Sequence, residues 1–196
     1  MHTLTKLIAV FALLFNLAAL SIKGADIDDL TWEITADDAV SIIDCKLDAT
    51  GELVIPDVIE RRIVTSIGAS TFEDCTGLTS VTIPDSVTSI GDRVFRNCDG
   101  LTSVIIGEGV TSISNQAFEF CESLTSVMMS DSVTSIGGAA FSICVSLTSV
   151  TIPDSVTSIG VGAFFFCKSL TSVTIPESVT SIENNTFYNC ASLTSV

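Results

Sequence analysis

The chain repeats itself every 23 residues, and this period constrains its fold more than any other feature of the sequence. Five columns of apolar residues keep the spacing through six consecutive units without an insertion. The columns start at Ile67, Phe72, Cys75, Leu78 and Val81 and end at Ile182, Phe187, Cys190, Leu193 and Val196. A unit of this length cannot bury its apolar side alone, so successive units must stack into a solenoid with one continuous core.

One unit, residues 78–100, indicates how each coil is expected to fold. Apolar residues alternate with Ser and Thr over 78–83, which predicts a short strand with one buried face. Residues 87–90 predict a second short extended segment. Val94, Phe95 and Cys98 then follow with helical spacing, so we expect one or two helical turns on the remaining side.

The first residues are typical of a secretory signal peptide, which we assign to residues 1–24. A positively charged start precedes an apolar run over 7–20, and small residues follow it. This run is shorter than the ~20 apolar residues that a membrane span requires. We therefore expect a secreted or cell-surface protein, with no membrane insertion of the mature chain.

The remainder divides into a cap and the repeats. Residues 25–50 break the period and are expected to form an N-terminal cap, in which Trp32 would cover the apolar end of the core. Residues 51–196 are assigned to about six coils, the last of them incomplete. The sequence ends at Val196 in the first strand of a new coil, and this uncapped coil is expected to permit end-to-end self-association.

Charge and histidine content exclude several classes of function. The net charge is -15 and the isoelectric point is near 4.1, which disfavours nucleic acid because a phosphate backbone would be repelled. The only histidine, His2, falls within the predicted signal peptide. A mature chain without histidine lacks the base of a Ser-His-Asp or Cys-His arrangement and the commonest metal ligand. We expect no enzyme activity, no cofactor and no metal.

The repeat sequence LTSVTIPDSVTSIG, followed by A-F-x-x-C, resembles the BspA-type leucine-rich repeats over about residues 50–196. Departures are small: Ile106-Gly107 and Met129-Ser130 replace Ile-Pro, and Thr71, Val94 and Thr186 replace the Ala before Phe. The resemblance implies an α/β leucine-rich-repeat solenoid, a right-handed curved superhelix with a parallel sheet on its concave face. It also implies secreted or cell-surface proteins that bind other proteins, often as adhesins, and it supplies no catalytic residues.

Outward residues of the first strand form one set of partner-binding candidates. They are Ser80, Thr82, Ile105, Met128, Thr151 and Thr174. A neutral concave face of this kind suits contact with another protein. A regular Thr grid would suit ice binding instead, but Ile105 and Met128 interrupt it.

A second set of candidates lies just after the core phenylalanine of the later coils. Early coils carry polar residues there, such as Glu73 and Asp74, whereas later coils carry Phe120, Ile143, Phe165, Phe166 and Tyr188. If the core phenylalanines and cysteines point inward, much of this set should face outward as a contiguous apolar stripe. Such stripes mark interaction sites. The alternative is that one or two of these side chains tuck between coils.

Acidic and cysteine columns leave further alternatives open. The acidic column comprises Asp57, Asp85, Glu108, Asp131, Asp154 and Glu177; it would either cap local backbone amides or recruit Ca²⁺ or a basic partner. The column cysteines are interpreted as buried thiols, because parallel side chains seldom meet disulfide geometry. Cys45 stands outside the column and would pair with Cys75 if the cap folds onto the first coil. Asn184 begins a single N-glycosylation sequon.

These observations predict a non-catalytic module that binds an extracellular protein. The alternative is a structural spacer within a longer repeat protein, and an ice-binding surface is a third candidate.

Overall fold

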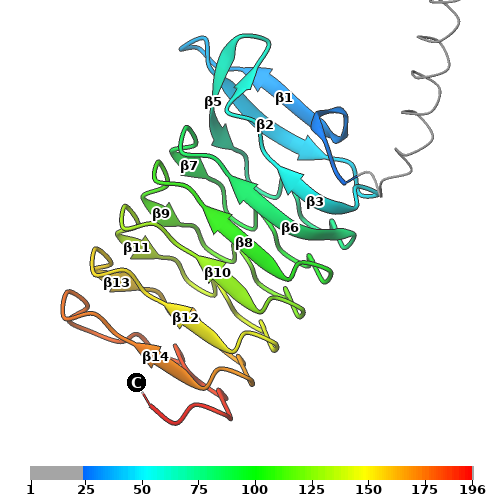
Figure 1. Ribbon diagram of the computed structural model, residues 1–196. Coiled ribbons are helices and arrows are strands. Elements are labelled where there is room, and N and C mark those ends of the chain that lie inside the picture. The colour runs from blue at the N-terminus through cyan, green and yellow to red at the C-terminus, as the bar shows by residue number, and fades with distance from the viewer. Residues whose placement is uncertain (1–23, 196) are drawn as a thin grey trace, which may run out of the picture.

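The computed structural model describes residues 24–195, which form a stack of three-sided coils that advances from the N-terminal to the C-terminal end (Figure 1). The predicted signal peptide lies outside the described residues, apart from Gly24. Within residues 24–195, no helix is long and apolar enough to cross a membrane.

The first side of the stack carries parallel strands, called here the main sheet. They are β3 (Gly51–Val54), β6 (Leu78–Ile83), β8 (Ser103–Ile106), β10 (Ser126–Met128), β12 (Ser149–Thr151) and β14 (Ser172–Thr174). The first four strands hydrogen-bond as one sheet, and β12 pairs separately with β14. Equivalent residues pair in register, so that Val81 lies beside Val104 and Val104 beside Val127. A parallel bridge from Ser172 to Ser195 continues the pattern into the last coil. Equivalent residues of successive coils therefore lie over one another, as the 23-residue period predicts.

The second side carries shorter parallel strands. They are β5 (Arg62–Ile67), β7 (Ser89–Ile90), β9 (Ser112–Ile113), β11 (Ser135–Ile136) and β13 (Ser158–Ile159). The last isoleucine of each strand points into the core, and Ile67 pairs with Ile90 in register. Gly91 follows β7 at a bend where a Cβ atom would lie 2.3 Å from the backbone nitrogen of Ala69. A side chain at Gly91 would therefore require the two coils to shift apart at this bend.

The predicted helical turns on the third side are wrong. Among residues 24–195 the only helix is η1 (Ile27–Asp29), a 3-10 turn that lies before the repeats. The third side is instead a ladder of turns in which the amides of Phe72, Phe95 and Phe118 donate to carbonyls of the next coil, at 2.9, 2.8 and 2.8 Å. Amides two residues before and two residues after each phenylalanine do the same.

This ladder requires alternating backbone conformations. In the coil around Phe95, Arg93 and Asn97 are left-handed, with φ of 59° and 58°, and every later coil repeats left-handed residues at these two positions. An α-helix keeps φ near −63° and satisfies its amides internally. Here every second amide points along the stack, so a helix cannot form although the spacing of core residues suits one.

Stacked phenylalanine rings run through the centre of the core. Successive rings from Phe72 to Phe187 have centroids 4.9–5.5 Å apart and planes within 6–8° of parallel. The rings from Phe72 to Phe164 are fully buried. Because each ring covers the next, the core is continuous through all coils and no coil has a core of its own.

The N-terminal end is built differently. Strand β1 (Leu30–Ile34) pairs antiparallel with β2 (Val40–Cys45), and β2 pairs in parallel with β5 of the first coil. Trp32 is half-buried and packs against the core. Strand β4 (Val58–Ile59) forms a hairpin with β5 through Glu60 and Arg61, both at positive φ. These elements place an antiparallel layer over the end of the stack (Figure 1).

We predict that Phe118→Ala lowers the free energy of unfolding by about 3–5 kcal/mol. Its ring is fully buried between Phe95 and Phe141, at 5.4 and 5.3 Å. Urea denaturation followed by circular dichroism measures the loss. Phe187→Ala is the matched control, since Phe187 is half-buried and stacks on Phe164 alone among the described residues. Equal losses from the two variants would contradict the stacked-core interpretation.

Candidate protein-binding surfaces

One outward row of side chains crosses the main sheet, and we call it the main-sheet row. Strand register aligns its members, which are Val54, Thr82, Ile105, Met128, Thr151 and Thr174. Val54, Ile105 and Met128 are 59%, 46% and 65% exposed. Thr151 and Thr174 are exposed, whereas Thr82 is half-buried. The three apolar side chains of the row thus face solvent on one face of the sheet.

A row of serines runs parallel to the main-sheet row, two residues earlier in each strand from β6 to β14. Ser80 pairs with Ser103, and Ser103 with Ser126. Ser80 is half-buried. The face therefore offers small hydroxyl side chains beside larger apolar ones, which leaves the apolar row raised and accessible.

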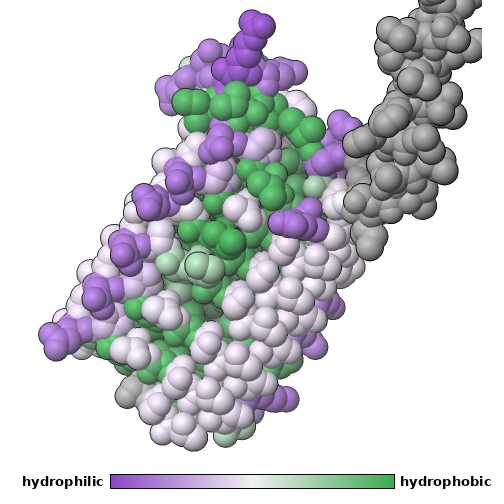
Figure 2. All heavy atoms as spheres, in the orientation of Figure 1, coloured by the Kyte–Doolittle hydropathy of each residue, from purple (hydrophilic) through white to green (hydrophobic). Residues whose placement is uncertain are grey.

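The acidic column follows on the other flank. All six of its members are exposed, and they recur once per coil where each main-sheet strand ends. Asp85 accepts a hydrogen bond from the backbone N–H of Glu108 in the next coil, at 2.9 Å. Figure 2 shows a regular line of hydrophilic side chains along one edge of this face and an apolar band beside it. The described residues contain no group of three acidic, cysteine or histidine side chains arranged to hold a metal ion.

Two features of this face were not anticipated from the sequence. Val54 of β3 adds an exposed apolar residue to the start of the main-sheet row. Its neighbour in register is the polar residue Thr82. Val58 and Ile63 form an exposed cross-strand pair on the β4–β5 hairpin, at 51% and 56% exposure. The only sequence signal for the hairpin is the insertion around Glu60, which displaces the repeat spacing there.

Threonines at the corners of the coils have a structural role that sequence patterns did not reveal. The hydroxyl of Thr102 donates to the carbonyl of Thr79 at 2.8 Å, and that of Thr134 donates to Thr111 at 3.0 Å. Further threonines repeat both contacts along the stack. Because their hydroxyls satisfy backbone carbonyls of the previous coil, these threonines join the coils.

The second candidate set, called the late-coil patch, comprises Phe120, Ile143, Phe165, Phe166 and Tyr188. Phe165 stacks on Tyr188 with centroids 5.4 Å apart and lies 4.9 Å from Phe166. Tyr188 is 57% exposed, whereas the other four are half-buried. The structure thus brings these residues together. Because neighbouring rings cover one another, the side chains are less exposed than the outward orientation predicts.

Backbone conformation sets this patch apart. Phe120, Ile143 and Phe166 have φ of 62°, 61° and 61°, in the left-handed region. Asn97 and Asn189 hold the equivalent position in other coils, and asparagine tolerates it well. A bulky or β-branched residue there is strained, at a cost of order 1–3 kcal/mol. Three consecutive coils therefore carry side chains that the local backbone disfavours.

Two cations flank the patch. The Arg96 guanidinium lies 5.3 Å from the centroid of the Phe120 ring, and the Lys168 ammonium lies 5.2 Å from that of Phe166. Arg96 also forms ion pairs with Glu73 at 2.8 Å and Glu119 at 3.0 Å. These pairs connect three successive coils along the outside of the ladder.

Glu73 is the carboxylate whose ionisation this network shifts. A hydrogen bond from Ser70 and the pairing with Arg96 lower the pKa of Glu73 below its ordinary value. The same ion pairs raise the pKa of Arg96. The charged forms of both residues are therefore stabilised in the folded chain.

The column cysteines are buried, as predicted. Each thiol from Cys98 to Cys190 donates to the carbonyl of the core phenylalanine of the previous coil, at 3.0–3.1 Å. Burial raises the pKa of Cys121 and Cys144, which keeps these thiols protonated and unreactive at neutral pH. The column therefore acts as a core element.

Asn184 lies on the outside of the last full coil. Its side chain is exposed, but the Thr186 hydroxyl of the same sequon is buried and donates to the carbonyl of Glu183 at 2.8 Å. The folded structure thus exposes the asparagine of the sequon and buries the threonine hydroxyl.

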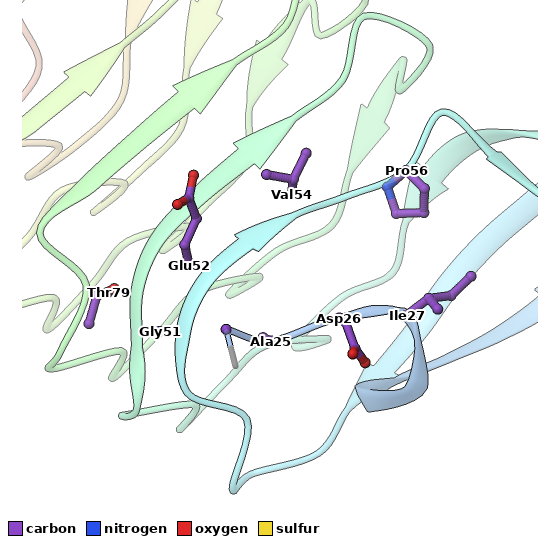
Figure 3. Close-up of a pocket in the computed structure, with 9 residues that line it drawn as sticks. Ala25, Asp26, Ile27, Gly51, Glu52, Val54, Pro56 and Thr79 are labelled. Carbon is purple, nitrogen blue, oxygen red and sulfur yellow. The ribbon is translucent and has the colours of Figure 1, made fainter. Parts of the chain in front are cut away.

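A shallow hollow of about 610 Å³ lies between the start of the described chain and strand β3 (Figure 3). Gly24, Ile27, Pro56 and Thr79 are among the residues that line it. Asp26 is one of its two carboxylates and caps η1 by accepting from the N–H of Asp28 at 3.0 Å. The hollow therefore combines a helix cap with apolar side chains and contains no nucleophile and base arranged for catalysis.

The stacked coils and extended sheet face define a leucine-rich-repeat solenoid. The family model for the BspA type leucine rich repeat region matches residues 62–196 in six copies. The chain therefore belongs to the BspA-type leucine-rich-repeat family, which confirms the resemblance noted in the repeat sequence.

Solved structures share this architecture. A leucine-rich repeat protein of T. pallidum is 30% identical, with a TM-score of 0.83 that covers 88% of this chain and 81% of that one. A leucine-rich repeat protein of Bacteroides ovatus is 31% identical, with a TM-score of 0.77 and coverage of 86% and 45%. One from Eubacterium ventriosum is 26% identical, with a TM-score of 0.64 and coverage of 86% and 51%. The chain spans about half the length of the last two.

The right-handed stack of parallel strands is thus established for this chain by its similarity to the T. pallidum protein. No curated protein matches the chain in sequence.

We predict that Ile143→Asn changes the free energy of unfolding by less than about 1 kcal/mol. Relief of left-handed strain, worth about 1–2 kcal/mol, opposes the loss of a half-buried apolar side chain, worth roughly 1 kcal/mol. Chemical denaturation measures the balance. Val127→Asn is the control on the main sheet: its side chain is buried, and we expect a loss of about 3 kcal/mol or more. A similar loss from Ile143→Asn would show that Ile143 is a core residue.

We predict that Glu73→Gln destabilises the protein at neutral pH by less than about 1 kcal/mol. The pKa of Glu73 is lowered in the folded state, so its contribution is present above the unfolded-state pKa and is lost as pH falls through the folded-state pKa. The difference in unfolding free energy between variant and wild type should therefore shrink in acid. A difference that is constant with pH would contradict the ion-pair explanation.

Proposed function

We propose that the chain is a non-catalytic module that binds another extracellular protein through the outer face of its main sheet. The observation that carries the proposal is the main-sheet row, in which Val54, Ile105 and Met128 are aligned in register and exposed. Exposed apolar residues on a rigid sheet provide area for burial in a complex, and Ile105 and Met128 are direct neighbours in register. Each fully buried side chain of this size contributes about 1.5–3 kcal/mol.

The flanking acidic column supports a particular chemistry of partner. One carboxylate per coil repeats along the edge of the sheet, and the whole chain carries a net charge of -15. A segment that presents apolar residues to the main-sheet row and Lys or Arg to the column would match both features. Complementary charges mainly speed association and set orientation, while the apolar contacts hold the complex.

Export supports the extracellular setting. The predicted signal peptide over residues 1–24 would direct the chain out of the cell. Family membership supports the same class of function, because stacked repeats offer an extended surface whose variable positions recognise partners.

The late-coil patch is a second candidate surface, favoured by its strained backbone. Phe120, Ile143 and Phe166 occupy left-handed positions that Asn holds elsewhere, so they are retained against a local cost. Strain of this kind clusters at functional sites. The patch lies on the third side of the coils, away from the main-sheet row, so the two surfaces can be tested separately.

The main-sheet surface can be tested with Ile105→Thr combined with Met128→Thr. Threonine is the repeat's own residue at this row position, as in Thr151 and Thr174, so the fold should be retained. The probe is a labelled short peptide that alternates Lys and Leu, and fluorescence anisotropy measures its affinity. We expect the double variant to bind at least about tenfold more weakly, which corresponds to a loss of about 1.4 kcal/mol.

Two controls define the interpretation. A peptide that alternates Glu and Leu should bind poorly, and added salt should weaken binding of the Lys-Leu peptide by screening the acidic column. Ile143→Asn combined with Phe166→Asn serves as the matched protein control on the late-coil patch. Loss of binding in that control alone would move the site to the patch. Unchanged binding in both variants would contradict the proposal and favour a structural spacer.

A further inference from the structure

Two thiols meet where the N-terminal cap joins the first coil. Cys45 is the last residue of β2, and Cys75 follows the first core phenylalanine of the stack. Both side chains are buried, at 3% and 0% exposure. Both sulfur atoms approach the carbonyl oxygen of Lys46, at 3.6 Å from Cys45 and 3.8 Å from Cys75, so the two thiols converge on one acceptor.

This arrangement differs from the cysteine column. Cys98 donates to the carbonyl of Phe72 at 3.0 Å, and each later column thiol makes the equivalent short bond. A disulfide between two column thiols would leave buried carbonyls without these donors, which is costly. Cys75 has no repeat coil before it, so its acceptor is the more distant carbonyl of Lys46. Oxidation at this position removes only long and weak contacts.

Side-chain direction favours the same pair. Column cysteines occupy equivalent positions in successive coils, so their Cα–Cβ bonds run parallel, whereas a disulfide needs a dihedral near 90°. Cys45 comes from the antiparallel cap and Cys75 from the first coil, at positions that are not equivalent in the repeat. Their side chains approach from different elements, so their Cα–Cβ bonds are not held parallel as those of the column cysteines are.

We propose that Cys45 and Cys75 form a disulfide that fastens the N-terminal cap to the first coil. The cap covers the end of the stack through pairing of β2 with β5, and half-buried Trp32 packs there. A covalent bond at Cys45 would hold this layer in place by restricting the chain between the two cysteines when the cap opens. An exported chain meets the oxidising conditions in which such bonds persist.

The reaction is thiol–disulfide exchange with a small disulfide oxidant such as oxidised glutathione. When the cap opens and exposes the two buried thiols, Cys75 loses its proton to solvent and its thiolate attacks one sulfur of the oxidant. This forms a mixed disulfide and releases one glutathione thiolate. Cys45 then loses its proton to solvent, attacks the Cys75 sulfur and releases the second glutathione thiolate. The protein loses two protons and two electrons, and the oxidant takes up two electrons and two protons to become two thiols.

The order of attack follows from the opposite pKa shifts of the two thiols. Interaction between these neighbouring groups lowers the pKa of Cys75 and raises that of Cys45. The thiolate is the attacking species, so Cys75 reacts first.

The test uses the full chain, purified in reductant and then exposed while folded to oxidised glutathione. The sequence contains seven cysteines, so free thiols counted in denaturant with Ellman's reagent should fall from seven to five. Trypsin cleaves after Lys23, Lys46, Arg62 and Arg93, which places Cys45 in peptide 24–46 and Cys75 in peptide 63–93. Mass spectrometry should detect these two peptides joined, with the loss of two hydrogens.

Variants supply the controls. Cys45→Ser should retain all of its remaining thiols after oxidation, whereas Cys121→Ser in the column should still lose two. Seven free thiols in the oxidised wild type would overturn the proposal. So would glutathione held on Cys75 without a crosslink, or a bond between other cysteines such as Cys167 and Cys190. The wild-type measurements decide the matter even if a variant fails to fold. A negative result here would leave peptide binding by the main-sheet row unaffected.

Discussion

Hydrogen bonding from each coil to the next is the constraint on which the rest of the structure depends. The main sheet and the short strands bond along the stack in the ordinary parallel manner. The third side does so through turns, in which the amide of Phe95 and those two residues to either side donate to the following coil. Because all three sides are tied in the same direction, each residue must lie over its equivalent, and the core becomes a set of identical columns.

This constraint separates positions that build the fold from positions that are free to vary. Columns of Phe, Cys, Leu and Ile are enclosed, and corner threonines such as Thr102 bond to the coil before them. Outward positions on the main sheet make no such contacts between coils. At these positions Ile105 and Met128 replace the threonine of the repeat. Ile143 is also a departure from the repeat. The ladder of turns imposes its left-handed backbone, a conformation that strains its side chain. Both surfaces proposed for binding therefore consist of departures from the repeat.

The ladder also explains what happens at its N-terminal end. Cys98 finds a close carbonyl acceptor at 3.0 Å because a complete coil precedes it, whereas Cys75 has only the carbonyl of Lys46 at 3.8 Å. The cap replaces the missing coil with an antiparallel layer, which brings Cys45 against Cys75 and Trp32 against the core. A column residue that is inert elsewhere thus acquires a reactive neighbour only where the repeat is interrupted.

The period, the buried columns and the main-sheet strands can be read from the amino-acid sequence, because apolar residues such as Val81 and Val104 recur at a spacing that only stacking can bury. The sequence could not determine the third side. Val94, Phe95 and Cys98 have a spacing that suits a helix as well as a turn, and the choice is made by amides that bond to a neighbouring coil. The exposure of the late-coil patch was likewise decided by tertiary structure, since Phe165 is covered by Tyr188 of the next coil. Local patterns specify which face of a segment is apolar, whereas contacts between coils specify its backbone conformation and what remains accessible.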